Sequence, residues 1–417
     1  MLHHEDDRAG IQLQADGVEK ILVINCGSSS IKYSFYDTTN KSRNAHGVVD
    51  RLGIDGTHLV HHGPIGEINR DLPKCDFAKA FHAIIAELTT KESGVIGSES
   101  ELTVVAHRVV HGGEKFTEGT LITDDVLKQI ESLSSLAPLH NPVNAAGIRE
   151  MRRLFPKIPQ VAVFDTAFHH TLPAHAYLYG LPYELYEQKC VRRYGFHGTS
   201  HQYVSLKAAE TLGRQPDELR LVSCHLGNGA SLCAVDRGRS IDTSMGLTPT
   251  EGLIMGTRCG DVDPGLSAFL ERTENLSAVE SEELFNKKSG LLGLSGVSSD
   301  MREVLKAAGD ENPRAVLAIK AYCYRVRKYI GSYVAAMGGL DALIFTGGVG
   351  QGSFDVRAQA VQGLEWMGVT LDAQRNRDAR GFDEVCRIST DDSKVTVLVV
   401  PTDEERMMAR ESLRTLR

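Results

Sequence analysis

Two arginines lie in segments whose composition suits the binding of an anion. Arg108 stands between two histidines in AHRVVHGGE (106–114), and Arg258 stands among glycines and aspartates in MGTRCGDVDPG (255–265). An arginine in a glycine-rich loop is costly to order for packing alone, so the pattern favours an anion ligand. Arginines aimed at a phosphoryl group in transfer accelerate the reaction by about 10³- to 10⁵-fold. The two segments therefore indicate phosphoryl transfer, which depends on positioning and positive charge.

Two further segments add a carboxylate and several histidines. Asp165 ends an apolar run in VFDTAFHHTLP (163–173), and YGFHGTSH (194–201) contains two histidines and a serine. A hydrolase with a Ser-His-Asp triad is an alternative interpretation, but it lacks the GxSxG elbow and leaves the glycine-rich turns without a role. For any single histidine among the 16 in the chain, a structural role is the simpler interpretation.

Three glycine-rich turns could receive phosphate or a nucleotide. INCGSSSIKYSFYD (24–37) places a glycine and three serines between two apolar strands, with Lys32 just beyond. Backbone N–H groups, hydroxyls and an ammonium in such a turn form a donor array for phosphate oxygens. LVSCHLGNGASLCAVDRG (221–238) repeats this pattern, and FTGGVGQGS (345–353) follows a third strand. Solvated turns and a plain strand-to-helix connection are the simpler alternatives, and neither a Walker A string nor GxGxxG occurs in the chain.

The elements that must position these groups alternate between strands and helices, which predicts an α/β fold. The expected strands start near residues 21, 103, 161, 219, 342 and 395. The clearest predicted helix runs from Pro313 to Met337, with Asn312 as N-cap and Gly338 as the stop. Its apolar stripe indicates a core helix, with a dimer interface as the alternative. Because the strand-turn-strand pattern occurs twice, we expect a duplicated architecture with a cleft between the halves.

Length and composition limit the class of protein. A chain of 417 residues with 41% hydrophobic and 24% charged residues predicts a soluble protein of two or three domains. The net charge of −8 argues against nucleic acid or an anionic membrane as the main partner. The eight cysteines contain no CxxC pair, and the start of the chain is acidic, so we expect reduced thiols, a cytoplasmic location and no secretory signal. No apolar run is long enough to span a membrane.

Nine motifs, in this order, resemble those of the acetate kinases. They cover the chain from about Ile21 to the C-terminus: NCGSSSIK, AHRVVHGGE, APLHNP, FDTAFHHTLP, YGFHGTSH, HLGNGAS, DTSMGLTPTEGLIMGTRCGDVDPG, FTGGVG and PTDEE. The resemblance implies the actin, sugar-kinase and heat-shock-chaperone superfamily: two duplicated actin-like (ribonuclease H-like) domains with a nucleotide cleft between them. It also implies ATP + acetate ⇌ ADP + acetyl phosphate, with Mg²⁺ or alternatively Mn²⁺ as cofactor, and a homodimer.

The implied domains are 21–164 plus 403–417 on the acetate and metal side, and 165–402 on the nucleotide side with the dimer interface. Residues 1–20 are expected to form a flexible extension without an assigned role. Departures from the usual motifs are Cys26 in place of alanine and GGVGQGS in place of GGIGENS in the third turn.

The resemblance also implies roles for single residues. The catalytic group comprises Arg108, Asp165, His197 and Arg258, with Asp165 in a positioning role because a carboxylate nucleophile needs no general base. The implied acetate site comprises Arg108, Val110, Leu139, His140, Phe196 and Pro249. The implied metal site comprises Asn25 and Glu404. The implied nucleotide site comprises Ser28, Ser30, Lys32, His225, Leu226, Gly227, Asn228, Gly229, Asp300, Met301, Arg302, Gly347, Gly348, Val349, Gly350 and Gln351.

Two alternatives to acetate phosphorylation stay open. The same chemistry on propionate or butyrate differs by one or two methylenes, which sequence motifs do not distinguish. A nucleotide-driven binding protein, chaperone-like or filament-forming, would need an added peptide-binding domain or polymer surfaces. The 13 residues after Glu404 leave no room for such a domain.

Overall fold

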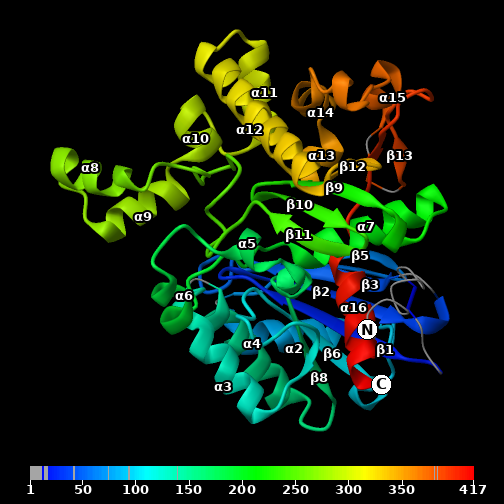
Figure 1. Ribbon diagram of the computed structural model, residues 1–417. Coiled ribbons are helices and arrows are strands. Elements are labelled where there is room, and N and C mark those ends of the chain that lie inside the picture. Colours follow the sequence, from blue (N-terminus) through cyan, green and yellow to red (C-terminus); the bar gives the residue numbers. More distant parts are fainter. Residues whose placement is uncertain are drawn as a thin grey trace. The chain divides into compact units, whose positions relative to one another are not determined.

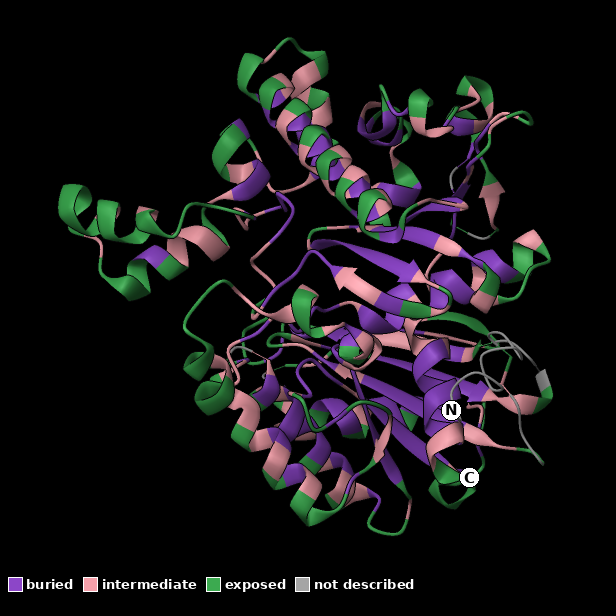
Figure 2. Cartoon of the chain, in the orientation of Figure 1, coloured by how far each residue is buried: buried purple, intermediate pink, exposed green. Residues whose placement is uncertain are grey.

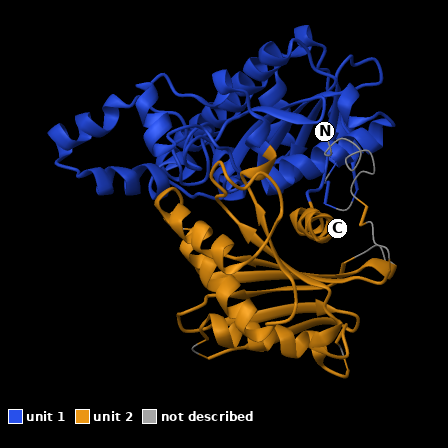
Figure 3. Cartoon of the chain, turned by 60° about the horizontal axis from the view of Figure 1, so that its bottom comes forward, with its two compact units in different colours: residues 1–10, 169–402 blue, residues 11–168, 403–417 orange. Residues whose placement is uncertain are grey.

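The computed structural model of the chain describes residues 12–13, 17–40, 43–73, 75–92, 94–138, 140–379, 381–382 and 384–417. These residues form two compact units (Figure 3): unit 1 contains residues 169–402, and unit 2 contains residues 11–168 and 403–417. Most of the expected N-terminal extension, residues 1–20, lies outside the described residues. The assignment of acetate, metal and nucleotide to particular domains stays a prediction.

Unit 2 is built around a mixed sheet of eight described strands (Figure 1). In spatial order they are β5 (Gly66–Asp71), β4 (His58–Gly63), β3 (Arg43–Asp50), β2 (Ser30–Asp37), β1 (Lys20–Cys26), β6 (Val104–Val109), β8 (Gln160–Phe164) and β7 (Thr120–Leu121). β1 and β2 form an antiparallel hairpin, whereas β6 and β8 continue the sheet in parallel with β1. The carboxyl ends of β1, β6 and β8 therefore meet at one edge.

Helices cover the sheet of unit 2. They are α2 (Phe77–Thr89), α3 (Asp124–Ser132), α4 (Asn141–Leu154) and α16 (Glu404–Leu416). Successive side chains of β1 enter different cores, as strand geometry requires. Ile21 and Val23 pack in a cluster with Met408 of α16, whereas Leu22 and Ile24 pack in a cluster that includes residues of α2. Because β1 is buried on both faces, its sequence is a continuous apolar run.

Unit 1 repeats this arrangement around a sheet of six described strands. In spatial order they are β11 (Arg239–Thr243), β10 (Ala230–Asp236), β9 (Arg220–Leu226), β12 (Ala342–Thr346), β14 (Thr396–Val399) and β13 (Cys386–Arg387). β9 and β10 form the antiparallel hairpin, and β12 and β14 continue in parallel with β9. The same hairpin followed by two parallel strands occurs in both units, so the predicted internal duplication and the α/β fold are confirmed.

The helices of unit 1 include one long core helix. They are α5 (Ala174–Tyr177), α6 (Tyr183–Lys189), α7 (Gly198–Leu212), α8 (Gly265–Glu274), α9 (Ala278–Lys287), α10 (Gly290–Ser295), α11 (Met301–Gly309), α12 (Pro313–Met337), α13 (Gly347–Gly352), α14 (Phe354–Val361) and α15 (Ala373–Asp378). The predicted bounds of α12 are confirmed, since Asn312 caps its start and Gly338 is left-handed at its end. Figure 2 shows one face of α12 buried and the other exposed.

No described helix is both long enough and apolar enough to cross a bilayer.

Candidate active site

The β1–β2 turn presents polar groups at the sheet edge of unit 2. The N–H of Gly27 donates to the carbonyl of Ser30 over 2.8 Å and closes the turn. Asn25 lies opposite Lys32 in the hairpin register, so both side chains leave the sheet on the same face. Asn25 and Ser30 are half-buried, whereas Ser28 and Lys32 are exposed. The turn thus offers exposed donors, as the predicted phosphate role requires.

Arg108 and Asp165, at the ends of the neighbouring strands β6 and β8, form a two-point ion pair. Arg108 Nε donates to Asp165 Oδ1 over 2.8 Å, and Nη2 donates to Oδ2 over 2.7 Å. The Asp165 side chain is 3% exposed and that of Arg108 is 23% exposed. Burial alone would lower the pKa of Arg108, but Asp165 and Glu404 raise it above its usual value. Asp165 therefore fixes the plane of a permanently charged guanidinium.

Glu404 brings a second carboxylate to this pair from the first residue of α16. Burial raises the pKa of Glu404, Asp165 raises it further, and Arg108 and Lys32 act in the opposite direction. The four side chains thus form one electrostatic group in unit 2. Within the described residues no three His, Cys, Asp or Glu side chains form a ready metal site.

Side chains of α4 hold the loop that follows β6. Asn144 accepts from the N–H of Val110 through Oδ1 over 3.1 Å and donates through Nδ2 to the carbonyl of Cys26 over 3.0 Å. It therefore ties the β1–β2 turn to the end of β6. Val110 is buried, and His140 lies at the N-cap position of α4. Leu139, also predicted for the acetate site, lies outside the described residues.

The β9–β10 turn of unit 1 lies against the loop that contains Arg258. The N–H of Gly227 donates to the carbonyl of Gly229, and the N–H of Gly256 donates to the carbonyl of Asn228 over 2.9 Å. A Cβ on Gly256 would lie 1.9 Å from Asn228 Oδ1 and 3.0 Å from the carbonyl oxygen of Ser299, so a larger residue would displace the Asn228 side chain. The two predicted segments, far apart in sequence, are therefore packed together.

Arg258 is a half-buried arginine without a carboxylate partner among the described residues. Its Nη1 donates to the carbonyl of Pro249 over 3.3 Å and contacts Met255 Sδ at 3.7 Å. Burial lowers its pKa, and no acidic group offsets that effect. A partly desolvated guanidinium beside a glycine turn is suited to bind an anion.

His197 stands next to Arg258 in an unusual backbone conformation. Its φ is +55°, in the left-handed region that non-glycine residues seldom occupy, at the N-cap position of α7. A Cβ on Gly229 would lie 3.5 Å from His197 Nε2 and 3.4 Å from Arg258 Nη1. The two nitrogens thus flank the same turn. The imidazole of His197 stacks on that of His225, with ring centroids 4.3 Å apart.

A half-buried ion pair holds the loops that contain Phe196 and Pro249. Arg193 Nη2 donates to Glu251 Oε1 over 2.6 Å, and the hydroxyl of Tyr179 donates to Glu251 Oε2 over 2.5 Å. Arg193 Nη1 also donates to the carbonyl of Thr243 over 2.9 Å. Phe196 is buried and Pro249 is half-buried. The network fixes both apolar residues predicted for the acetate site in this unit.

A cavity of about 860 Å³ lies in unit 1, which is large enough for a nucleoside. Seven predicted nucleotide residues line it: Gly227, Asn228, Asp300, Met301, Arg302, Gly348 and Val349. His225, Leu226, Gly229, Gly347, Gly350 and Gln351 are not among its lining residues. Arg302 is 90% exposed and pairs with Asp300 over 2.6 Å at the cavity mouth. The glycine-rich turns in 221–238 and 345–353 and the start of α11 therefore line one cavity.

Sequence reasoning missed the other wall of this cavity. Phe354 and Phe382 line it, together with Ser353, Asp355, Arg377 and Ala379. Apart from Ser353, which ends FTGGVGQGS, these residues belong to no glycine-rich motif. Asn144, which ties the first hairpin to β6, was missed for the same reason.

The duplicated fold defines the chain as a protein of the actin-like class. Residues 20–410 match the model of the acetokinase family. The chain therefore belongs to this family. An acetate kinase from Halothermothrix orenii is 52% identical over 95% of this chain and 99% of its own length.

Solved structures agree with this assignment. The acetate kinase of Porphyromonas gingivalis is 47% identical, covers 96% of this chain and 100% of its own, and superposes with a TM-score of 0.90. A propionate kinase from Francisella tularensis is 39% identical, covers 94% of this chain and 98% of its own, and gives a TM-score of 0.88. The predicted duplicated actin-like fold is thus confirmed.

Proposed function

We propose that this protein transfers the γ-phosphoryl group of ATP to acetate in one reversible in-line step, which gives acetyl phosphate and ADP. Membership of the acetokinase family makes the chain an enzyme that phosphorylates a carboxylate. The observation that carries the proposal is Arg258, which has no carboxylate partner among the described residues and lies with His197 at the Gly229 turn.

In the proposed step an oxygen of acetate attacks the γ-phosphorus as the bond to the β-phosphate oxygen breaks. Arg258 and Arg108 spread positive charge over the transferring group, and His197 donates a hydrogen bond to it. Acetate is already ionised at neutral pH, so no side chain has to remove a proton from it. Asp165 accordingly orients Arg108, which its two hydrogen bonds support.

The acetate methyl is proposed to lie against Val110, Phe196 and Pro249. Because the solved relatives include a propionate kinase, a propionate-specific enzyme is the alternative. We expect kcat/KM to be highest for acetate and to fall about tenfold for propionate, since one methylene in an apolar pocket changes binding by about 1–3 kcal/mol. Initial rates with acetate, propionate and butyrate at one ATP concentration measure this. A higher kcat/KM for propionate would instead support the alternative.

Mg²⁺ is the proposed metal, with Mn²⁺ as its substitute, held by Asn25 and Glu404. Both offer oxygen ligands, and Mg²⁺ commonly keeps several waters and takes only one or two protein carboxylates together with substrate phosphates. The burial of Glu404 beside Asp165 leaves negative charge that a cation would offset. When bound, the metal would neutralise charge on the β- and γ-phosphates.

Glu404→Gln should raise the Mg²⁺ concentration for half-maximal activity at least tenfold, because it removes the charged ligand. The matched control is Glu405→Gln, which changes the adjacent carboxylate on α16. Activity titrated with Mg²⁺ after removal of metal by EDTA distinguishes the variants. Equal Mg²⁺ dependence of Glu404→Gln and Glu405→Gln would remove Glu404 from the site.

Adenine is proposed to occupy the 860 Å³ cavity, whose two walls are held together by Arg357. Arg357 is fully buried, and burial lowers its pKa to about 10. Its guanidinium donates to the carbonyls of Gly350, Gln351, Asn376 and Ala379 and to Asn376 Oδ1, over 2.6–2.9 Å. It therefore fixes both the third glycine turn and the segment before Phe382.

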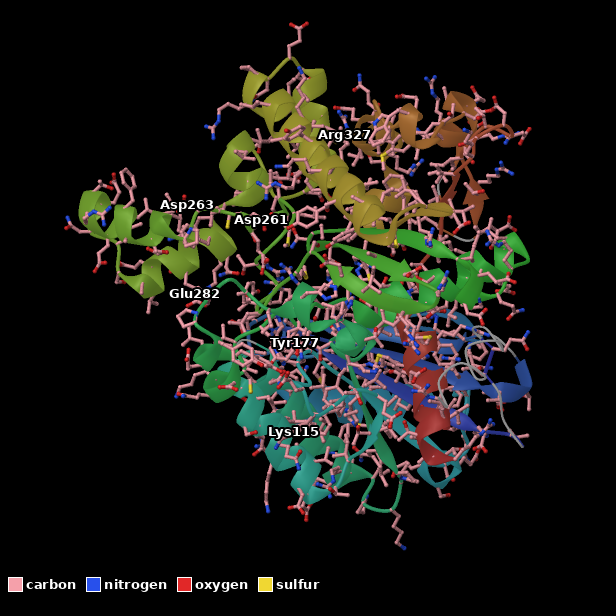
Figure 4. The ribbon with its side chains drawn as sticks, in the orientation of Figure 1. Lys115, Tyr177, Asp261, Asp263, Glu282 and Arg327 are labelled. Carbon is pink, nitrogen blue, oxygen red and sulfur yellow. The ribbon has the colours of Figure 1, made fainter. Side chains whose placement is uncertain are left out.

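We expect Arg357→Met to raise KM for ATP about tenfold and to lower the free energy of unfolding by about 3 kcal/mol, because several buried carbonyls lose their donor. KM for acetate should stay within about twofold. Arg327→Met is the control: Arg327, on α12 (Figure 4), also donates to two carbonyls, but these belong to Gln359 and Ala360. An unchanged KM for ATP in folded Arg357→Met would contradict the proposal that Arg357 holds the two walls of the adenine cavity in place.

A second copy of the chain is the proposed protein partner, and the helical arm of α8 and α9 supports a homodimer. Both helices project from the rest of unit 1 in Figure 1 and are largely exposed in Figure 2. Phe269 is 52% exposed and Val279 is 74% exposed. Large apolar side chains exposed on a projecting arm are suited to an interface between copies. Light scattering of the wild type and of Phe269→Asp measures the assembly.

The proposed location is the cytoplasm, without a nucleic-acid or membrane partner. All eight cysteines are free thiols, as expected in a reducing compartment. The net charge of −8 disfavours anionic polymers.

Trapping the product with hydroxylamine tests the proposed function. The wild type with ATP, acetate, Mg²⁺ and hydroxylamine should give acetyl hydroxamate and ADP in equal amounts. A nucleotide-driven binding protein or a hydrolase would give no hydroxamate.

A further inference from the structure

Four side chains of unit 1 form a continuous hydrogen-bonded relay that ends at His197. Ser223 Oγ of β9 lies 2.9 Å from His201 Nδ1 of α7, and His201 Nε2 lies 2.8 Å from Ser231 Oγ of β10. Ser231 Oγ in turn lies 2.9 Å from His197 Nδ1. Ser223, His201 and Ser231 are all fully buried, so water does not compete for these bonds.

The direction of the relay follows from its first member. Among the described residues, the hydroxyl of Ser223 has no hydrogen-bond partner other than His201. If Ser223 accepted from His201, its own O–H would be buried without an acceptor, which is unfavourable. Ser223 therefore donates to His201 Nδ1.

Each later bond is then determined in turn. Because Nδ1 of neutral His201 accepts, its proton is on Nε2, which donates to Ser231 Oγ. Because Ser231 Oγ accepts from His201, it donates its own proton to His197 Nδ1. Nδ1 of His197 is thereby an acceptor, and the proton of a neutral His197 lies on Nε2.

This Nε2 is the nitrogen that faces the reaction site. A Cβ on Gly229 would lie 3.5 Å from it, next to Arg258 Nη1. We propose that Ser223, His201 and Ser231 are positioning residues that hold His197 as the neutral Nε2–H tautomer, ready to donate to an oxygen of the transferring phosphoryl group. The inference rests on the proposed function in assigning that acceptor.

The surroundings of the relay favour neutral imidazoles. Among the described residues, His169, His225 and Arg258 are charged or titratable groups that lie beside His197 and His201. All are neutral or positive, so a second proton on either ring would meet repulsion. Burial and the nearby His169 and His225 hold the pKa of His201 well below 6.5.

Nitrogen NMR of the histidine side chains tests the tautomer directly, without any turnover. In wild-type protein labelled with ¹⁵N on histidine at pH 7.5, His197, assigned by comparison with His197→Gln, should show protonated Nε2 and unprotonated Nδ1. A proton on Nδ1, or on both nitrogens, would overturn the proposal. An enzyme that forms no acetyl phosphate but shows the Nε2–H tautomer would refute the proposed function and leave the relay intact.

Ser223→Ala tests the relay at its far end, because Ser223 touches His201 but not His197. Without its donor, His201 has no preferred tautomer, so both His197 tautomers should appear in the spectrum. If the two His197 tautomers are equally populated, kcat should fall to about half, because only the Nε2–H tautomer donates. KM for ATP and KM for acetate should stay unchanged. Ser240→Ala is the control, since Ser240 is equally buried and bonds to His169 Nδ1 over 2.8 Å. A single Nε2–H tautomer in folded Ser223→Ala would show that the relay does not set it.

Discussion

Replacement of Arg258 by alanine is expected to lower kcat at least about 100-fold, equivalent to about 2.7 kcal/mol of transition-state stabilisation. Its guanidinium is half-buried without a carboxylate partner among the described residues, so its charge is available to a bound anion. The charge that develops on a phosphoryl group in transfer is spread over its equatorial oxygens, where a planar guanidinium binds best.

The stability of this variant should separate a catalytic from a structural role. Loss of a partly desolvated, uncompensated charge should leave the free energy of unfolding unchanged or slightly higher. Arg258→Lys should recover only part of kcat, since an ammonium keeps the charge but lacks the planar two-point hydrogen-bonding geometry of a guanidinium. Arg327→Ala, in the same unit, should keep near-normal turnover. Near-normal kcat in folded Arg258→Ala would refute the assignment.

Asp165→Ala is expected to lower both activity and stability, in contrast to Arg258→Ala. It removes the buried carboxylate of a partly buried two-point ion pair and leaves Arg108 without its hydrogen-bonded partner. The cost should stay below about 3–5 kcal/mol, the range typical of a fully buried pair, because Arg108 is partly exposed and Glu404 lies nearby. We expect kcat to fall at least about tenfold as well, because the plane of Arg108 is no longer fixed. Denaturant unfolding and initial rates measure the two effects.

The double variant Arg108→Ala/Asp165→Ala distinguishes pairing from separate roles. With both partners gone neither member of the pair is left without its counter-charge, and Glu404 keeps Lys32 and loses the repulsion of Asp165. The double variant should therefore be more stable than Asp165→Ala. Its kcat should be no better than that of Arg108→Ala. Additive losses of stability would mean that the two side chains act independently.

Much of the fold was predictable because local signals and the tertiary structure agree. The predicted bounds of α12 agree with the structure because its ends are strongly signalled. Asn312 caps its start, Pro313 suits its first turn, and Gly338 ends it. The repeated strand-turn-strand pattern was visible because each hairpin pairs residues close in sequence. The glycine-rich turns were also visible, and at Gly347 a φ of +75° and the carbonyl of Leu226 2.7 Å from a Cβ favour glycine.

The residues that support these turns were not predictable, because their contacts join distant segments. Asn144 donates to the carbonyl of Cys26, 118 positions away, and no local pattern signals that bond. Arg357 reaches both walls of the cavity only after α13 and α15 have packed. The relay from Ser223 to His197 needs β9, β10 and α7 together. Positions of this kind follow from the fold rather than from motifs.

The structure also bears on the hydrolase alternative. A Ser-His-Asp triad needs an aspartate that orients a histidine. Both oxygens of Asp165 instead accept from Arg108, and His197 bonds to Ser231 through Nδ1. Among the described residues, Asp165 therefore serves Arg108 rather than a histidine, as the triad would require.

The configuration at phosphorus after one turnover tests direct transfer to acetate most closely. ATP made chiral at the γ-phosphorus with three oxygen isotopes, incubated with acetate and Mg²⁺, should yield acetyl phosphate of inverted configuration, because each in-line displacement inverts the phosphorus once. Retained configuration would require two displacements through a phosphorylated side chain and would contradict the account.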